Sequence, residues 1–193
     1  GLGESIAWDL FENDYTVPTG KNLYITNIYT HFAYHFQIDG KEIFGGDTYA
    51  QNGGSMLNLP ICVKSDQTFS FYHPWSPPSV MPTFHGTLVD AIVEPITYHF
   101  DHADSGYENY TVTSGKTLVI TQLLIEWNSV LLIDGVTFGD ARFNSHLSVG
   151  GNQLKIPLIL NSGSVLFVEG NQTPTNNPTA GFNGYLVDED YFA

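Results

Sequence analysis

Positively charged residues are scarce in this sequence. Six lysines and arginines stand against 20 aspartates and glutamates among 193 residues, which gives a formal net charge of -14. A nucleic-acid-binding surface needs clustered basic side chains to neutralise phosphates. Attraction to an anionic membrane surface depends on the same side chains. We therefore expect neither nucleic acid nor a membrane surface among the partners.

Cysteine is nearly absent as well, because Cys62 is the only one. A disulfide within the chain and a cysteine zinc cluster are thereby excluded. No apolar run approaches the roughly 20 residues needed to cross a bilayer, so we expect no membrane insertion. The chain starts at Gly1 rather than at methionine, and we expect an N-terminus that has been processed or trimmed.

Catalytic patterns are also missing. There is no G-x-S-x-G nucleophile motif, Cys62 lies in an apolar run, and the single arginine, Arg142, makes phosphate or carboxylate clamps hard to build. A glycosidase-like carboxylate pair stays open, since 20 acidic residues form many chance pairs. Charged residues make up only 13% of the chain, about half the usual share. We expect a non-enzymatic protein with the polar, weakly charged surface that is typical of β-rich surface proteins.

An internal repeat dominates the sequence. YTVPTGKNLYIT at 15–26 matches YTVTSGKTLVIT at 110–121, and IDG at 38–40 matches IDG at 133–135. Further along, LNLPI at 57–61 matches LKIPL at 154–158, TFSF at 68–71 matches SVLF at 164–167, and FHGTLVD at 84–90 matches FNGYLVD at 182–188. Collinear matches of this kind indicate a tandem duplication. We expect two domains, at residues 1–91 and 92–193.

Short segments rich in Val, Ile, Tyr, Phe and Thr alternate with turn residues, which predicts β-strands. About eight strands in each repeat favour an all-β fold of two tandem jelly-roll-like β-sandwiches. Period-two alternation predicts one buried face in each strand; it places Leu154, Ile156, Leu158 and Leu160 on one such face. The predicted cores contain Leu23, Ile25, Phe69, Phe71 and Leu88, with counterparts Leu118, Ile120, Val165, Phe167 and Leu186.

Two strand-like runs contain a proline, Pro60 and Pro157. Proline cannot donate to a β-ladder, so these strands are predicted to be edge strands or bulged. Their second face is not fully polar, because it carries Cys62 and Ile159. We expect that face to need a cover.

Recurring aspartates are the candidate metal ligands. Asp39 and Asp134 precede glycine in both repeats, Asp47 and Asp140 also recur, and Asp101 and Asp104 lie in the acidic stretch between the repeats. An Asp-Gly pair is first of all turn chemistry. If a metal binds, we expect calcium, which prefers carboxylate and carbonyl oxygens in loops. His31 and His35 have no third ligand in the pattern, and no other cofactor is expected.

A second candidate site is aromatic. The stretch FYHPWSPP at 71–78 contains three prolines, which exclude it from a regular ladder, and it carries Tyr72 and Trp75. An exposed ring there can stack on a sugar. The alternative is that Trp75 closes the end of its own sandwich.

The combination of YTVPTGKNLYIT, IDG and the closing GYLVDEDYF resembles a repeat found in exported or phage-borne tandem β-sandwich proteins of bacteria. The resemblance covers both halves. Its motifs are turn and core residues, so it implies a fold and carries over no functional residue.

We expect a structural subunit that assembles with copies of itself in an extracellular appendage, a surface layer or a virion. A duplicated module offers two similar sheet edges, and such edges pair with other chains unless they are blocked. Both a closed ring and an open filament stay open. The alternative is a glycan-binding module, lectin-like or adhesin-like, at a cell surface.

Overall fold

The structure, a computed structural model, describes residues 3–29, 35–45, 55–72, 82–100, 109–125, 129–140, 152–170 and 180–192. The first half contains β1 (Glu4–Asp9), β2 (Tyr15–Thr16), β3 (Lys21–Tyr29), β4 (His35–Ile38), β5 (Lys41–Gly45), β6 (Ser55–Val63), β7 (Thr68–Tyr72) and β8 (Thr83–Asp90). The second half contains β9 (Glu94–Phe100), β10 (Asn109–Thr111), β11 (Lys116–Ile125), β12 (Ser129–Ile133), β13 (Val136–Asp140), β14 (Asn152–Leu160), β15 (Val165–Gly170) and β16 (Ala180–Asp188), followed by a short 3-10 helix η1 (Glu189–Phe192).

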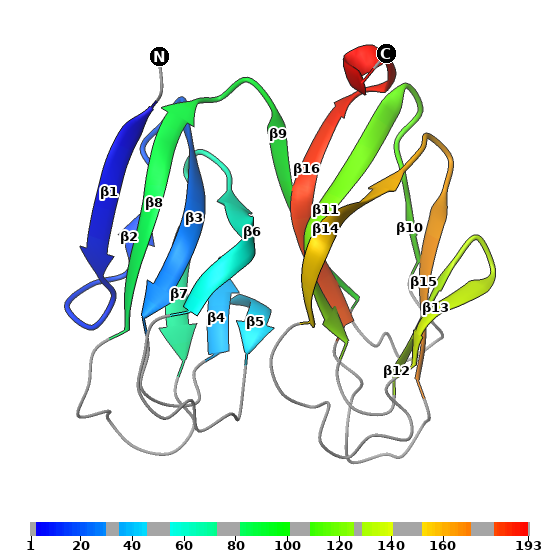
Figure 1. Cartoon of the computed structure of the whole chain (residues 1–193), viewed down its shortest axis with the longest axis horizontal. Helices are drawn as coiled ribbons and strands as arrows, with labels where there is room; N and C mark the ends of the chain where they lie inside the picture. The colour runs from blue at the N-terminus through cyan, green and yellow to red at the C-terminus, as the bar shows by residue number, and fades with distance from the viewer. Residues whose placement is uncertain are drawn as a thin grey trace.

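Each half consists of two four-stranded antiparallel sheets (Figure 1). The sheets of the first half have the orders β1-β8-β3-β6 and β2-β7-β4-β5. Those of the second half have the orders β9-β16-β11-β14 and β10-β15-β12-β13, which are the same orders with eight added to each number. Eight strands in this arrangement form a jelly roll. The predicted all-β sandwich architecture is confirmed.

A separate hydrophobic core fills each sandwich. Leu23, Ile25, Phe69 and Leu88 belong to the first core and Phe71 packs against it, as predicted. Phe69 also contacts two other buried rings, lying parallel to Phe36 and edge-on to Phe84. Alternation explains the burial, because every second residue of β8 points into the core.

The second core contains Leu118, Ile120 and Leu186 as predicted, but the prediction for β15 was wrong. Leu166 and Val168 are the core residues of this strand, in place of Val165 and Phe167. Ile38 pairs with Phe69 in the first half, and Ile133 pairs with Leu166 in the second. The sequence match therefore placed β15 one residue out of register, and a shift of one residue exchanges the two faces of a strand.

The proline-bearing strands β6 and β14 are edge strands of their sheets. Each also has a register shift against its neighbour, β3 or β11, near Pro60 or Pro157. The prediction of bulged edge strands is confirmed. The predicted inward position of Ile156 was wrong, since this side chain is exposed. It lies inside the irregular stretch of β14, where regular alternation no longer applies.

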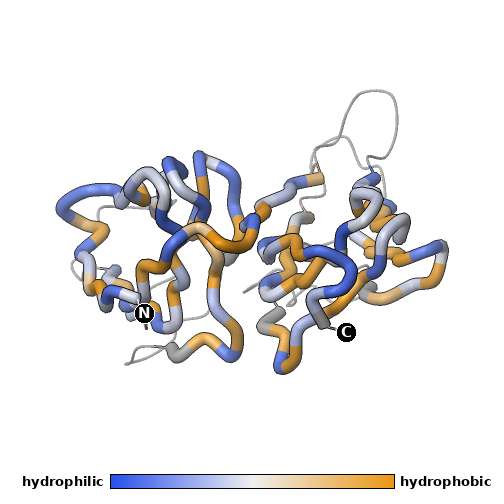
Figure 2. Tube along the Cα trace, turned by 90° about the horizontal axis from the view of Figure 1, so that it is seen from above, coloured by the Kyte–Doolittle hydropathy of each residue, from blue (hydrophilic) through white to orange (hydrophobic). Residues whose placement is uncertain are grey.

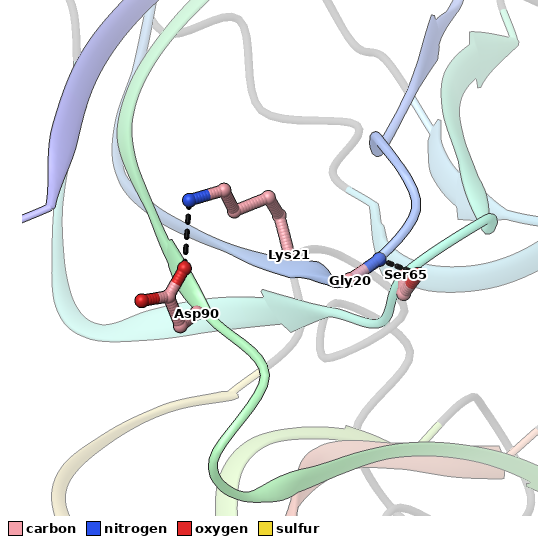
Figure 3. Close-up of polar contacts among 4 residues, drawn as sticks. All are labelled: Gly20, Lys21, Ser65 and Asp90. Atoms are coloured by element: carbon pink, nitrogen blue, oxygen red, sulfur yellow. Dashed lines mark hydrogen bonds and ion pairs between the residues drawn. The ribbon is translucent and has the colours of Figure 1, made fainter.

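The same polar contacts close one end of each sandwich. In the first half, the Gly20 amide donates to Ser65 Oγ at 2.9 Å, and Lys21 Nζ donates to Asp90 Oδ1 at 2.7 Å (Figure 3). The counterpart bonds in the second half are Gly115 N to Ser162 Oγ at 3.2 Å and Lys116 Nζ to Asp188 Oδ1 at 2.8 Å. The YTV…GK motif thus ties the start of β3 and β11 to two other segments of its own sandwich.

The two sandwiches lie side by side in both views (Figures 1 and 2), with β5 and β6 of the first half toward the second half. Residues Glu4–Asp9 form β1, which pairs with β8 of the same sandwich. Among the described residues, no helix has the length and apolar character that crossing a membrane requires.

Gly86 and Gly184 occupy equivalent places where another backbone approaches closely. A Cβ atom on Gly86 would lie 2.7 Å from the Tyr24 carbonyl oxygen, and one on Gly184 would collide with the Val119 carbonyl oxygen. We expect Gly86→Ala and Gly184→Ala each to lower the free energy of unfolding by about 1–3 kcal/mol through overpacking. Urea unfolding monitored by fluorescence measures this, with Ser5→Ala on the exposed face of β1 as the control. Unfolding midpoints equal to that of the control contradict the proposed close approach.

Candidate functional site

The main contact between the two halves is made by the edge strand β6. It lies against β11, β14 and β16 of the second half, and β5 beside it touches β11, β16 and β9. An edge of the first sandwich therefore sits on the outer face of the β9-β16-β11-β14 sheet. We call β5 and β6 the first edge, and β13 and β14, their counterparts in the second half, the second edge.

Asn183 is the centre of this contact. Its Oδ1 accepts a hydrogen bond from the Cys62 amide at 2.7 Å, and its Nδ2 donates to the Cys62 carbonyl at 2.6 Å. Nδ2 also lies 3.0 Å from Thr97 Oγ1 on β9. The Asn183 side chain is buried. One amide group thus satisfies both main-chain groups of a residue on an edge strand, as a neighbouring strand otherwise does.

The bulge in β11 supplies two further polar residues to the contact. Register shifts between Ile120 and Gln122, so Thr121 and Gln122 both leave the core although they are consecutive. Gln122 Nε2 donates to the Leu59 carbonyl at 2.6 Å, and Thr121 Oγ1 lies 4.0 Å from Cys62 Sγ. The bond from Gln122 is a third hydrogen bond to the main chain of β6, after the two made by Asn183.

Burial in this contact changes the acid–base behaviour of the Cys62 thiol. Burial raises the pKa of its thiol to about 12, because a thiolate loses hydration in an apolar site. The neighbouring Tyr24 hydroxyl also has its pKa raised to about 12, mainly by burial. Cys62 is therefore a protonated, packed side chain at neutral pH and a poor nucleophile.

The acceptor face differs between the halves. On the second half, Val119, Thr121, Asn183 and Val187 point outward from their sheet and are nevertheless buried. Strand pairing gives Thr26 and His85 as the counterparts of Thr121 and Asn183 on the first half, and both are exposed. The outer face of the β1-β8-β3-β6 sheet thus presents an acceptor position that no part of the described chain covers.

The two edges also differ in burial, but here the first half has the buried residues and the second half the exposed ones. Cys62 is 0% exposed, whereas its counterpart Ile159 is 49% exposed. Ile43 on β5 belongs to the core of its own sandwich and is 2% exposed, whereas Phe138, its counterpart by strand pairing on β13, is 47% exposed. On the second edge Val136 and Ile156 are also exposed, at 70% and 77%. The first edge is covered within the chain, and the second edge displays apolar side chains to solvent.

Asp39 and Asp134 are turn residues in the structure. Both have positive φ, at 52° and 50°. Asp39 Oδ1 accepts from the Thr68 amide at 2.8 Å, and Asp134 Oδ1 accepts from the Val165 amide at 2.7 Å. Each carboxylate ties the turn of one hairpin to the start of the next strand in its sheet, which is the capping role common for Asp in turns.

The other calcium candidates lie wholly or partly outside the described residues. Asp47, Asp101 and Asp104 lie outside the described residues, and for Asp140 only the backbone, in β13, is described. Within the described ranges, no three His, Cys, Asp or Glu side chains come together in a group that could hold a metal ion. Calcium stays a prediction.

Of the two aromatic candidates, Tyr72 lies among the described residues and Trp75 does not. Tyr72 ends β7 and is 53% exposed, with its ring centroid 6.2 Å from that of His35. His35 Nδ1 in turn lies 2.6 Å from Glu42 Oε1. Trp75 and His31 lie outside the described residues. Among the aromatic candidates, Tyr72 is therefore the one whose ring the structure describes, and that ring is exposed.

A shallow pocket of about 240 Å³ lies where the segment after β8 meets the end of β16. Its lining includes Ile92, Lys116, Asp188 and Tyr191. Lys116 and Asp188 already form an ion pair with each other. The volume is below the roughly 300–1,000 Å³ typical of small-molecule sites.

Sequence reasoning missed Asn183, Thr121 and Gln122. One signal was present: within the matching segments FHGTLVD and FNGYLVD, the position between Phe and Gly changes from His85 to Asn183. A polar residue in an otherwise apolar strand indicates a partner for its hydrogen bonds. Comparison with models of protein families and with curated proteins gave no match to this chain.

Removal of the Asn183 side chain should separate the halves. Asn183→Ala leaves the buried amide and carbonyl of Cys62 without partners, so we expect the free energy of unfolding to fall by about 2–4 kcal/mol. The Cys62 thiol should also react faster with a thiol reagent at pH 8. Asn161→Ala, at an exposed position, is the control. Equal stability and equal thiol reactivity in the two variants contradict the role assigned to Asn183.

Substitutions of the turn residue Asp134 distinguish a capping role from calcium binding. Asp134→Ala places alanine at positive φ and removes the cap of Val165, so we expect a loss of stability; the left-handed conformation alone costs roughly 1–2 kcal/mol. Asp134→Asn tolerates this conformation and keeps an acceptor. Thermal melts with calcium and with a chelator give the second readout. Bound calcium must raise the midpoint of the native chain and raise that of Asp134→Asn less, whereas unchanged midpoints remove calcium from the account.

Proposed function

We propose that this chain is a non-enzymatic structural subunit that assembles with copies of itself in an extracellular appendage, a surface layer or a virion. One observation carries the proposal: the second edge is apolar and exposed. Val136, Phe138, Ile156 and Ile159 are four of the nine large apolar side chains that are exposed among the described residues. Apolar side chains exposed on two edge strands favour a surface that another molecule covers.

The first edge supports the same proposal. It has the same place in the jelly roll and is covered by a protein surface within the chain. Edge strands present unpaired main-chain groups that invite further β-pairing or docking. A fold that covers one of two equivalent edges internally and leaves the other apolar favours a contact between chains.

The chemistry of the described residues supports a structural role over a catalytic one. The single cysteine is buried and protonated, and His35 is paired with Glu42. The recurring aspartates Asp39 and Asp134 cap turns. The extracellular or virion location rests on composition, since few charges and many Tyr, Asn and Gly residues are typical of β-rich surface proteins.

Glycan binding is the second candidate function, and Tyr72 favours it. This ring is exposed at the end of β7, directly before the segment that contains Trp75. An exposed tyrosine beside polar groups such as His35 is a typical sugar-stacking platform. Copies of the chain in an assembly would present this end of the first sandwich many times.

The mass of the chain in solution tests the assembly proposal. We expect sedimentation velocity to give species heavier than the 21.3 kDa monomer, with a fraction that rises with protein concentration. Ile156→Glu places a charge on the second edge and should shift the equilibrium toward the monomer, whereas Tyr72→Ala, an exposed ring elsewhere, should not.

A monomer at every concentration, with and without calcium, together with no polymer at the native source, contradicts assembly. In that case a glycan array comparing the native chain with Tyr72→Ala decides whether glycan binding takes its place.

A further inference from the structure

The contact within the chain provides a template for a contact between chains. It has two parts: an edge, β5 and β6, and an acceptor face, the outer side of the β9-β16-β11-β14 sheet. Because both halves have the same strand order, each part occurs twice. One edge and one acceptor face are used within the chain. Two surfaces are left: the exposed apolar side chains of the second edge, whose strand β14 also touches β6, and the exposed area around Thr26 and His85 on the outer face of the β1-β8-β3-β6 sheet, beside the buried Asn22.

We propose that the second edge of one copy docks on the outer face of the β1-β8-β3-β6 sheet of the next copy, in the geometry of the contact within the chain. This inference rests on the proposed assembly function and names its interface. The occupant of each free surface is a second copy of this chain. The main-chain groups at Ile159 take the place of those at Cys62, and His85 takes the place of Asn183.

The donor part fits, because the features of the first edge recur on the second. β14 has the same edge position, the same proline and a register shift like that of β6. Its outward residue Ile159 is larger and more apolar than Cys62. Burying Ile156 and Ile159 removes apolar area that now faces water, and burial of such area drives association.

The acceptor part fits for a similar reason. The bulge between Ile25 and Asn27 repeats the bulge between Ile120 and Gln122, so Thr26 and Asn27 stand where Thr121 and Gln122 stand. His85 is exposed between them and β1. Its ring carries both a donor and an acceptor nitrogen when neutral, which matches the two functions of the Asn183 amide.

The resulting contact joins two different surfaces, so it is heterologous. A heterologous contact propagates from copy to copy, and it ends in a closed ring when the rotation between copies divides a full turn. Each copy would then use both of its edges and both of its acceptor faces. Edge-to-edge pairing of two copies would also cover the second edge, but it would leave the acceptor position at Thr26 and His85 on the β1-β8-β3-β6 sheet open.

Cysteine cross-linking of full-length chains tests the contact. Ile159→Cys and His85→Cys are prepared separately, since both positions are exposed, and are mixed in equal amounts under mild oxidation. A disulfide needs Cα atoms about 4.4–6.8 Å apart, so we expect cross-linked dimers joining position 159 to position 85. Neither variant alone should form them, and the native chain, whose only thiol is buried, is the baseline.

A non-covalent measurement keeps the test independent of the thiols. His85→Glu should weaken self-association about tenfold or more, because it places a charge in the buried centre of the contact. Phe11→Glu, at an exposed apolar position outside both surfaces, should leave self-association unchanged. Sedimentation velocity reads both variants.

The outcomes separate the two proposals. Cross-links joining 159 to 85, with weaker association of His85→Glu, support this contact. Native association with 159-to-159 cross-links, or with no effect of His85→Glu, overturns this contact and leaves assembly standing. A monomer throughout overturns assembly and this contact together.

Discussion

The hydrogen bonds between the Asn183 amide and the Cys62 peptide groups fix the arrangement of the two halves. They satisfy an edge strand that cannot extend its ladder regularly, because Pro60 interrupts it. With β6 held in this way, the outward-facing residues of β11 and β16 are buried as well as the inward-facing ones. The free surfaces of the molecule follow from that arrangement, since the second edge is left without an equivalent cover.

Much of the fold was predictable because its determinants are local. Alternation identified inward residues such as Leu88 in β8 and Leu186 in β16, and Pro60 and Pro157 identified bulged edge strands. Errors arose where alternation fails. Ile156 lies in the irregular stretch of β14, and the similarity of TFSF and SVLF placed β15 one residue out of register. The turn contacts of Asp39 with Thr68 and Asp134 with Val165 give the correct alignment, but they are visible only in three dimensions.

The candidate site was predictable only in part. The need for a cover over Cys62 and Ile159 followed from their place opposite the core face, and the structure shows that cover for Cys62 alone. The partners were not predictable, because a bulge turns Thr121 and Gln122 outward together and breaks the period of two. Asn183 is contributed by a strand 121 residues away in the chain, and no local pattern reports such a separation.

Asn183 recognises the main chain of β6, and this has a consequence for how the sequence can change. At position 62 the amide bonds only to the main-chain N–H and C=O groups, and every residue except proline provides both. These two hydrogen bonds therefore do not depend on which side chain stands at position 62. The two halves can therefore differ in surface character, and so in what they display, without loss of the hydrogen bonds that hold them together.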